Sequence, residues 1–151
     1  MNPIKYEQAL NRLAVYCSRG ERCVQDIRRK MSLWGLPEAD QKKVILHLQR
    51  EKFLDERRYC RAFVHDKSQY NRWGSYKIQY ELKKKQIPDA LIREALSEID
   101  PDACREQLSQ LLANKRKTVK GANEYEINQK LIRFAAGKGF SLEDIETALD
   151  L

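Results

Sequence analysis

The chain of 151 residues has no apolar run that approaches the roughly 20 residues a membrane-spanning helix needs. Its first residues, Met1-Asn2-Pro3-Ile4-Lys5, also lack the apolar segment of a secretory signal. We therefore expect a cytoplasmic protein with no part in a membrane.

Glycine and proline are scarce, with six and four copies in the whole chain. Hydrophobic residues make up 42% and charged residues 34%. This balance is typical of a folded, helix-rich protein, and it argues against a disordered or low-complexity chain.

Metal-binding residue types are few and poorly spaced. The four cysteines, Cys17, Cys23, Cys60 and Cys104, form no C-x-x-C pair, and His47 and His65 are the only histidines. These spacings do not fit the usual zinc sites. We expect no metal and no cofactor, and cysteines that pack as small hydrophobic side chains.

Catalytic motifs are also missing. The sequence has no glycine-rich phosphate loop, no pair of acid and base carboxylates with a supporting group, and no nucleophile–histidine arrangement. We therefore expect a protein that is not an enzyme.

What the chain does contain is helical periodicity, seen best in residues 53–99. Asp55 precedes one helical pattern as a natural N-cap, and Ser75 is placed to cap the next. Pro88 opens a third helix, where a missing N–H is harmless. The stretch predicts three short helices packed as one unit.

The same unit recurs on both sides. Ile78-x3-Leu82-x3-Gln86-Ile87-Pro88 aligns with residues 27–37 at an offset of 51 and with residues 131–141 at an offset of 53. Such spacing indicates tandem repeats, and units of about 50 residues are marginal alone, so neighbours must pack on one another. We predict an all-α, elongated and curved array of three three-helix repeats with helices near right angles, over residues 1–52, 53–99 and 100–151.

Further helix starts are expected at side chains that can cap a first turn. Ser18 with Glu21 and Asn123 with Glu126 have capping-box spacing, Asp100 precedes a proline, and Ser141 opens the last helix. In that last helix Leu142, Ile145 and Leu149 are expected to be buried.

The net charge of +7 is uneven. Residues 1–50 hold ten basic and five acidic side chains, residues 51–100 hold eleven and nine, and residues 101–151 hold eight of each. An excess in the first two repeats favours an anionic partner, either nucleic acid or an acidic protein groove. A basic surface that serves only solubility is the alternative.

Two surface stripes could carry function. Arg57, Arg61 and His65 lie opposite the apolar face of their helix, and Tyr76, Tyr80 and Lys84 form an outward row on the next helix, with Lys77 and Lys83 beside it. Aromatic rings among amines can stack on bases or pair with carboxylates. The alternative is that Tyr76 or Tyr80 packs against a neighbouring repeat. Trp73 is expected to be a wedge between helices, and His65 a solvated residue.

The run Phe53-Leu54-Asp55-Glu56-Arg57-Arg58-Tyr59-Cys60-Arg61-Ala62-Phe63-Val64, followed by Trp73-Gly74 and Glu81-Leu82-Lys83-Lys84-Lys85-Gln86-Ile87, resembles the RecX family, as does Cys17-Ser18-Arg19-Gly20-Glu21 followed by Gly35-Leu36-Pro37. The resemblance covers nearly the whole chain and is weakest in the third repeat. Two departures are Gln86, where the family usually has glycine, and Cys60, where it usually has alanine. The family consists of bacterial cytoplasmic proteins that bind the RecA recombinase filament and usually restrain it.

The resemblance implies a regulator whose partner is the RecA nucleoprotein filament, with a weak DNA contact in addition. We expect a monomer, because the repeats can bury their apolar faces against one another. A module that binds nucleic acid directly, without RecA, is the alternative. The residues expected to contact the partner are basic or aromatic side chains of the first two repeats: Arg28, Arg29, Arg57, Arg61, Arg72, Lys77, Tyr80, Lys83 and Lys84.

Overall fold

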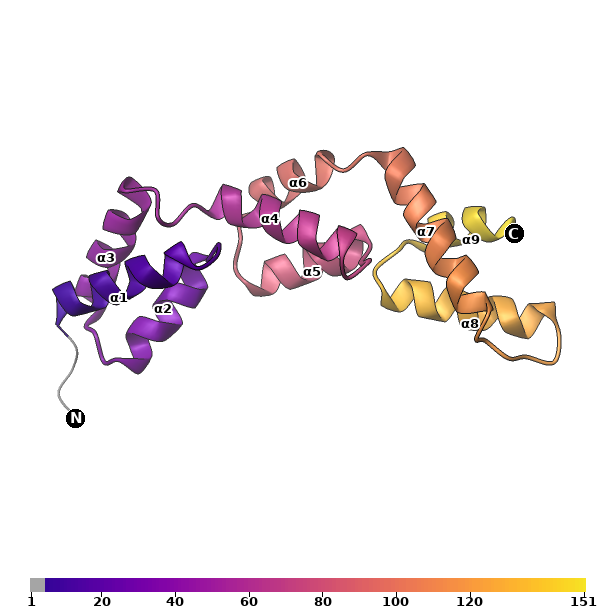
Figure 1. Ribbon diagram of the computed structural model, residues 1–151, viewed down its shortest axis with the longest axis horizontal. Coiled ribbons are helices and arrows are strands. Elements are labelled where there is room, and N and C mark those ends of the chain that lie inside the picture. Colours follow the sequence, from indigo (N-terminus) through magenta and orange to yellow (C-terminus); the bar gives the residue numbers. More distant parts are fainter. Residues whose placement is uncertain (1–4) are drawn as a thin grey trace.

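The computed structural model describes residues 5–151, and in that range it consists of nine α-helices without strands (Figure 1). Residues 1–4 lie outside the described range, so the expectation about a secretory signal at Met1 to Ile4 does too. The helices are α1 (Tyr6–Ser18), α2 (Val24–Leu33), α3 (Glu38–Arg50), α4 (Glu56–Gln69), α5 (Ser75–Lys84), α6 (Asp89–Ser97), α7 (Pro101–Arg116), α8 (Glu124–Gly137) and α9 (Leu142–Leu149).

The helices form three groups that follow one another along the longest axis of the molecule (Figure 1). We call them the first repeat (α1–α3), the second repeat (α4–α6) and the third repeat (α7–α9). The main helix–helix packing occurs inside each group, as in α1 on α3, α4 on α6 and α7 on α8. The predicted all-α tandem array is therefore confirmed.

Each repeat has its own hydrophobic core. Its centre is formed by aliphatic side chains that are at most 2% exposed: Leu13, Ile27 and Leu48 in the first repeat, Ile78, Leu82 and Ile92 in the second, and Leu108, Leu131 and Ile145 in the third. Burying one such side chain stabilises the fold by about 1.5–3 kcal/mol. Two residues pack in the core of the neighbouring repeat. Leu54, which precedes α4, packs in the first core, and Cys23, which precedes α2, packs in the second.

Most predicted N-caps are confirmed. Asp55, Asp100, Asn123 and Ser141 each accept a hydrogen bond from a backbone N–H of the following first turn. These bonds satisfy donors that the start of a helix leaves unpaired. Such caps depend on residues two or three positions apart, which is why the sequence reveals them.

Three local predictions are wrong. Ser18 is the last residue of α1, where its hydroxyl donates to the Val15 carbonyl, and Cys23 precedes α2 instead. Ser75 is the first residue of α5, and the N-cap is Gly74. Leu142 is 57% exposed, although it lies in the first turn of α9, three residues before the buried Ile145.

The second helix of every repeat ends in the same way. Gly35, Gln86 and Gly139 have φ of 75°, 60° and 101°, in the left-handed region. The next residue then donates its N–H to a carbonyl five positions earlier, which is the bond of a Schellman motif. These bonds are 3.0–3.2 Å long and join Leu36 to Met31, Ile87 to Leu82, and Phe140 to Ala135. The three joints that align in sequence are therefore equivalent in structure.

Gln86 departs from glycine at a position where a side chain is strained, since a left-handed residue costs about 1–2 kcal/mol. We expect Gln86→Gly to raise the free energy of unfolding by roughly 0.5–1 kcal/mol, because relief of strain exceeds the added freedom of the unfolded chain. Urea denaturation measures the change. Lys83→Gly, one turn earlier in α5 on an exposed site, is the control and should lose about 1 kcal/mol. A Gln86→Gly variant that loses stability as well would contradict the interpretation.

The second helices of the last two repeats meet end to end, which we call the α5–α8 joint. The N–H of Gly74 donates to the Lys138 carbonyl (2.7 Å), and the N–H of Tyr76 donates to the Gly139 carbonyl (3.0 Å). Unpaired donors at the start of α5 thus meet unpaired acceptors at the end of α8, and the two helix dipoles align favourably. This joint explains why Ser75 is not needed as a cap.

Candidate partner-binding surface

The outer face of α5 presents the predicted row. Tyr76 and Tyr80 are each 62% exposed, so neither is buried against a neighbouring repeat. The Lys84 ammonium lies 5.2 Å from the centre of the Tyr80 ring and 3.2 Å from a carboxylate oxygen of Glu81. Lys83 is exposed beside them. The alternative in which either tyrosine packs between repeats is therefore wrong for this structure.

Contacts between the first two repeats bring α2 to the C-terminal end of α5. The Gln25 side chain donates to the Lys84 carbonyl (3.1 Å), and the Lys85 ammonium pairs with Asp26 (2.9 Å). Arg28 and Arg29, exposed on α2, are thereby placed on the other side of this contact from Lys83 and Lys84. We call these four cations together with Tyr80 the α2–α5 surface.

Asp26 and Lys85 lie beneath that surface. Burial alone would raise the pKa of Asp26, but the hydrogen bonds from Lys85 and Cys23 and the charge of Lys85 outweigh burial and lower it. The hydrogen bond to Asp26 raises the pKa of Lys85, which burial and the charge of Arg29 oppose. Because the folded-state pKa of Asp26 is depressed, its contribution to stability is present above its ordinary pKa and lost as the pH falls.

Two further contacts join the start of α4 to the start of α2, and we call them, together with the Gln25 and Lys85 contacts, the α2–α5 joint. The Arg58 guanidinium pairs with Glu21 (2.5 Å), and a Glu56 carboxylate oxygen accepts from the N–H of Val24 (3.1 Å). Burial raises the pKa of Glu56 more than the bond from Val24 and the charge of Arg28 lower it. Sequence reasoning missed these residues, although one signal was present. The acidic residues Glu21 and Asp26 flank the start of α2, and basic residues end α5, so the two helix ends carry charges of opposite sign.

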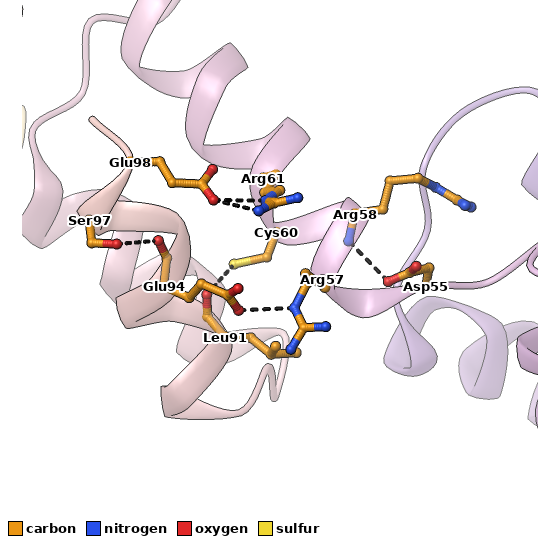
Figure 2. Close-up of polar contacts among 9 residues, drawn as sticks. All are labelled: Asp55, Arg57, Arg58, Cys60, Arg61, Leu91, Glu94, Ser97 and Glu98. Carbon is orange, nitrogen blue, oxygen red and sulfur yellow. Dashed lines mark hydrogen bonds and ion pairs between the residues drawn. The ribbon is translucent and has the colours of Figure 1, made fainter. Parts of the chain in front are cut away.

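The basic stripe of α4 is matched by acids of its own repeat. Figure 2 shows Arg57 paired with Glu94 (2.9 Å) and Arg61 paired with Glu98 (2.6 Å), so that two residues one turn apart on α4 meet Glu94 on α6 and Glu98, which directly follows α6. All four side chains are substantially exposed. Arg57 and Arg61 thus lie on the surface, but carboxylates balance more of their charge than of the charge of Arg28, Arg29 and Lys83.

Arg72 and Lys77 lie near the other joint instead. Arg72, in the loop between α4 and α5, has φ of 56° and is half-buried, and among the described residues its Nη1 has no hydrogen-bond partner. The Lys77 ammonium lies 4.5 Å from the ring centre of Trp73. Trp73 is half-buried and edge-on to Phe63, with ring centres 6.4 Å apart, which confirms the expected wedge.

The cysteines are thiols without a pairing partner. Cys23 and Cys60 are fully buried, and burial raises the pKa of each to about 11. Over residues 5–151, no group of three or more His, Cys, Asp or Glu side chains could hold a metal ion. In the same range no helix is long and apolar enough to cross a membrane.

A cavity of about 440 Å³ lies where the second and third repeats meet. Apolar side chains of the two repeats, including Trp73, Ile99 and Cys104, form part of its wall, and the Arg61–Glu98 pair borders it as well. No sequence pattern predicts this cavity, because its walls come from separate helices and the loops that join them. Arg61 and Gln107, two of its lining residues, are 46 residues apart.

Comparisons with known proteins find the same repeats. Residues 55–96 match the family profile described as "RecX, second three-helix domain", and residues 104–149 match "RecX, third three-helix domain". A regulatory protein RecX of Prosthecochloris aestuarii is 32% identical over 143 residues, covering 95% of this chain and 92% of that protein. One from Clostridium botulinum (strain Eklund 17B) is 33% identical, covering 81% of this chain, but the match spans only 58% of the relative.

Solved structures share the fold. A crystal structure of a regulatory protein RecX superposes with a TM-score of 0.89 at 23% identity, covering 97% of this chain and 73% of the other. A RecX from Lactobacillus salivarius superposes with a TM-score of 0.83 at 21% identity, covering 96% and 94%. The arrangement of three repeats in a row is thus also found in crystals of these proteins.

Proposed function

This chain belongs to the RecX family of regulatory proteins, and we propose from that membership that it binds the RecA–DNA filament and mostly inhibits the RecA recombinase. The protein would act in the cytoplasm, as a monomer, by binding rather than by catalysis. The observation that carries the proposal beyond family membership is the α2–α5 surface, which combines exposed cations with an exposed aromatic side chain.

The shape of the array supports a filament as the partner. Three repeats in a row present an extended face, as quasi-linear repeat proteins generally do. A RecA filament has a helical groove in which such a face would contact more than one subunit. Arg28, Arg29 and Lys84 would then meet acidic filament surface or DNA phosphate, with favourable long-range attraction.

The inhibition would follow from occupation. An array that lies in the groove blocks the second DNA molecule, and one that binds the growing end stops further subunits from adding. Either effect, or a weakening of contacts between neighbouring RecA subunits, requires no chemistry by the bound protein. Arg57, Arg61, Arg72 and Lys77 stay in the proposed contact set, with their ion pairs and ring contacts available for exchange.

The activity test is the DNA-dependent ATPase of the cognate RecA, followed by strand exchange. We expect substoichiometric amounts of this protein to slow both, because one bound array affects many subunits, and we expect no nucleotide hydrolysis by the protein alone. Inhibition that needs one molecule per RecA monomer would exclude capping of filament ends. No inhibition at any ratio would refute the proposed function.

Direct binding of nucleic acid is the second candidate, favoured by the exposed Tyr76 and Tyr80 among lysines of α5. The discriminating measurement is affinity for single-stranded DNA with and without RecA already bound to it. The filament proposal expects much tighter binding to RecA-coated DNA. Equal affinity for naked DNA would favour the second candidate.

A further inference from the structure

We propose that the α2–α5 joint is the hinge of the array, while the second and third repeats move as one body. We further infer that an anionic nucleic acid bound across the α2–α5 surface fixes the hinge angle. The first part stands on geometry alone, and the second part rests on the proposed function.

The α5–α8 joint is rigid because backbone meets backbone. A Cβ atom added at Gly74 would lie 2.5–2.6 Å from the Gly139 carbonyl group and the Phe140 nitrogen. Two backbone hydrogen bonds, donated by Gly74 and Tyr76, join the same segments. Backbone groups have no rotamers with which to follow a movement, so any tilt at this joint breaks the bonds or creates a clash.

The α2–α5 joint repeats the geometry with different residues. At the sequence offsets of the repeat, Cys23 takes the place of Gly74 and Gln86 the place of Gly139. Neither position is a glycine, and the polar contacts across this joint use a side chain on one or both sides. They are the Gln25 amide on the Lys84 carbonyl, Lys85 on Asp26, Arg58 on Glu21, and Glu56 on the Val24 N–H.

These contacts allow rotation and are sensitive to salt. The side chains of Arg58 and Glu21 are 44% and 30% exposed, and those of Lys85 and Asp26 are 34% and 17% exposed. Ion pairs in contact with water are screened as ionic strength rises. Cys23 stays fully buried in the second core and so acts as a pivot rather than letting the first repeat come free.

The hinge lies inside the α2–α5 surface. Arg28 and Arg29 belong to the moving repeat, and Lys83 and Lys84 belong to the fixed body. A ligand that contacts both sides binds the closed arrangement more tightly, and it therefore shifts the population toward that arrangement. A phosphate backbone carries the negative charge that such a ligand needs.

The test measures two distances by pulsed electron spin resonance, each in a protein that carries two labels. Spin labels are attached to unnatural ketone residues, so that the native cysteines stay untouched, at the exposed helical positions Gln49, Arg93 and Glu106. We raise the salt from about 50 mM to about 500 mM NaCl. The distribution of distances between labels at positions 49 and 93 should then at least double in width, while the distribution between positions 93 and 106 keeps its width. Equal broadening of both distributions, or of neither, would overturn the hinge.

Variants make the same point at low salt. Arg58→Gln with Lys85→Gln should broaden only the distribution from 49 to 93, and the exchanged pair Glu21→Arg with Arg58→Glu should keep it narrow. If the double glutamine variant is folded and its distance distribution from 49 to 93 is as narrow as that of the parent protein, the hinge is contradicted. Circular dichroism checks that each variant is folded.

The ligand part is tested by adding a single-stranded oligo-dT of about 20 nucleotides to the double glutamine variant at low salt, because high salt would itself weaken binding of the oligonucleotide. Narrowing of the distribution from 49 to 93 supports the coupling, and a broad distribution with saturating oligonucleotide refutes it. The salt and variant results do not involve RecA. Failure of the hinge and failure of the RecA proposal are therefore seen in separate measurements.

Discussion

Replacing Gly74 by alanine should lower the free energy of unfolding by about 3 kcal/mol. The added methyl group would lie 2.5 Å from the carbonyl carbon and oxygen of Gly139, and backbone cannot give way as a flexible side chain can. Overpacking of this kind costs about 1–3 kcal/mol, and the two hydrogen bonds of the joint contribute about 1 kcal/mol each. Opening of the joint would relieve the clash only by losing those bonds. Urea denaturation followed by circular dichroism gives the difference.

Gly137→Ala is the matched control, because nothing lies within 4 Å of a Cβ atom added there. Gly137 ends α8, and alanine should stabilise the helix by roughly 0.5–1 kcal/mol. The two glycines are thus expected to respond with opposite sign, although both belong to the ends of second helices. If both substitutions left stability unchanged, the close approach of Gly74 to Gly139 would not exist in solution.

The features that sequence predicted are those that depend on neighbours along the chain. Apolar spacing of three and four predicted the helices, and the recurrence of a helix stop at Gly35, Gln86 and Gly139 predicted the repeat. Helix caps such as Asp55 follow from contacts three residues apart. Periodicity also predicted that Tyr80 and Lys84 face outward together, which the exposed side chains confirm.

What the sequence could not predict depends on contacts between distant segments. Ser75 looks like a cap, but the donors at the start of α5 go to carbonyls at the end of α8, more than 60 residues later. Arg57 and Arg61 look like free cations, but their carboxylate partners lie 37 residues away, on α6 and directly after it. No local rule assigns such partners, and so charge patterns overstate the number of available cations.

The α2–α5 joint also depends on contacts between distant segments that the sequence does not specify. The first repeat was expected to pack on the second, but the sequence did not specify which residues would meet. Asp26 and Lys85 are 59 residues apart, and each has other charged residues nearby in sequence. Only the fold places the acid of one helix start beside the base of another helix end. The two departures from the family pattern, Gln86 and Cys60, turn out to be a strained joint residue and a buried core residue.

The combined substitution Tyr80→Ala and Lys84→Glu should sharply weaken inhibition of RecA while leaving the protein folded. Both side chains are exposed, so the loss of stability should stay near 1 kcal/mol, mostly from reversing a favourable charge at the end of α5 beside Glu81. In the proposed complex the change removes an aromatic anchor and adds like-charge repulsion. Such changes cost about 1–3 kcal/mol of binding, so inhibition of the RecA ATPase should need about 5- to 150-fold more protein.

The third repeat offers a control of the same composition, Tyr125→Ala with Lys117→Glu. Tyr125 is 71% exposed and Lys117 is exposed, whereas Lys115 lies 4.7 Å from the ring centre of Phe134 and would confuse stability with binding. The control should shift the inhibition curve much less, because the third repeat carries no excess of basic charge. Equal shifts for the two variants would mean that exposed charge anywhere on the array sets the affinity. If the Tyr80→Ala and Lys84→Glu variant is folded and inhibits normally, the proposed contact lies at Arg28 and Arg29 instead. Inhibition by a variant with both arginines replaced by glutamate would then be the decisive measurement.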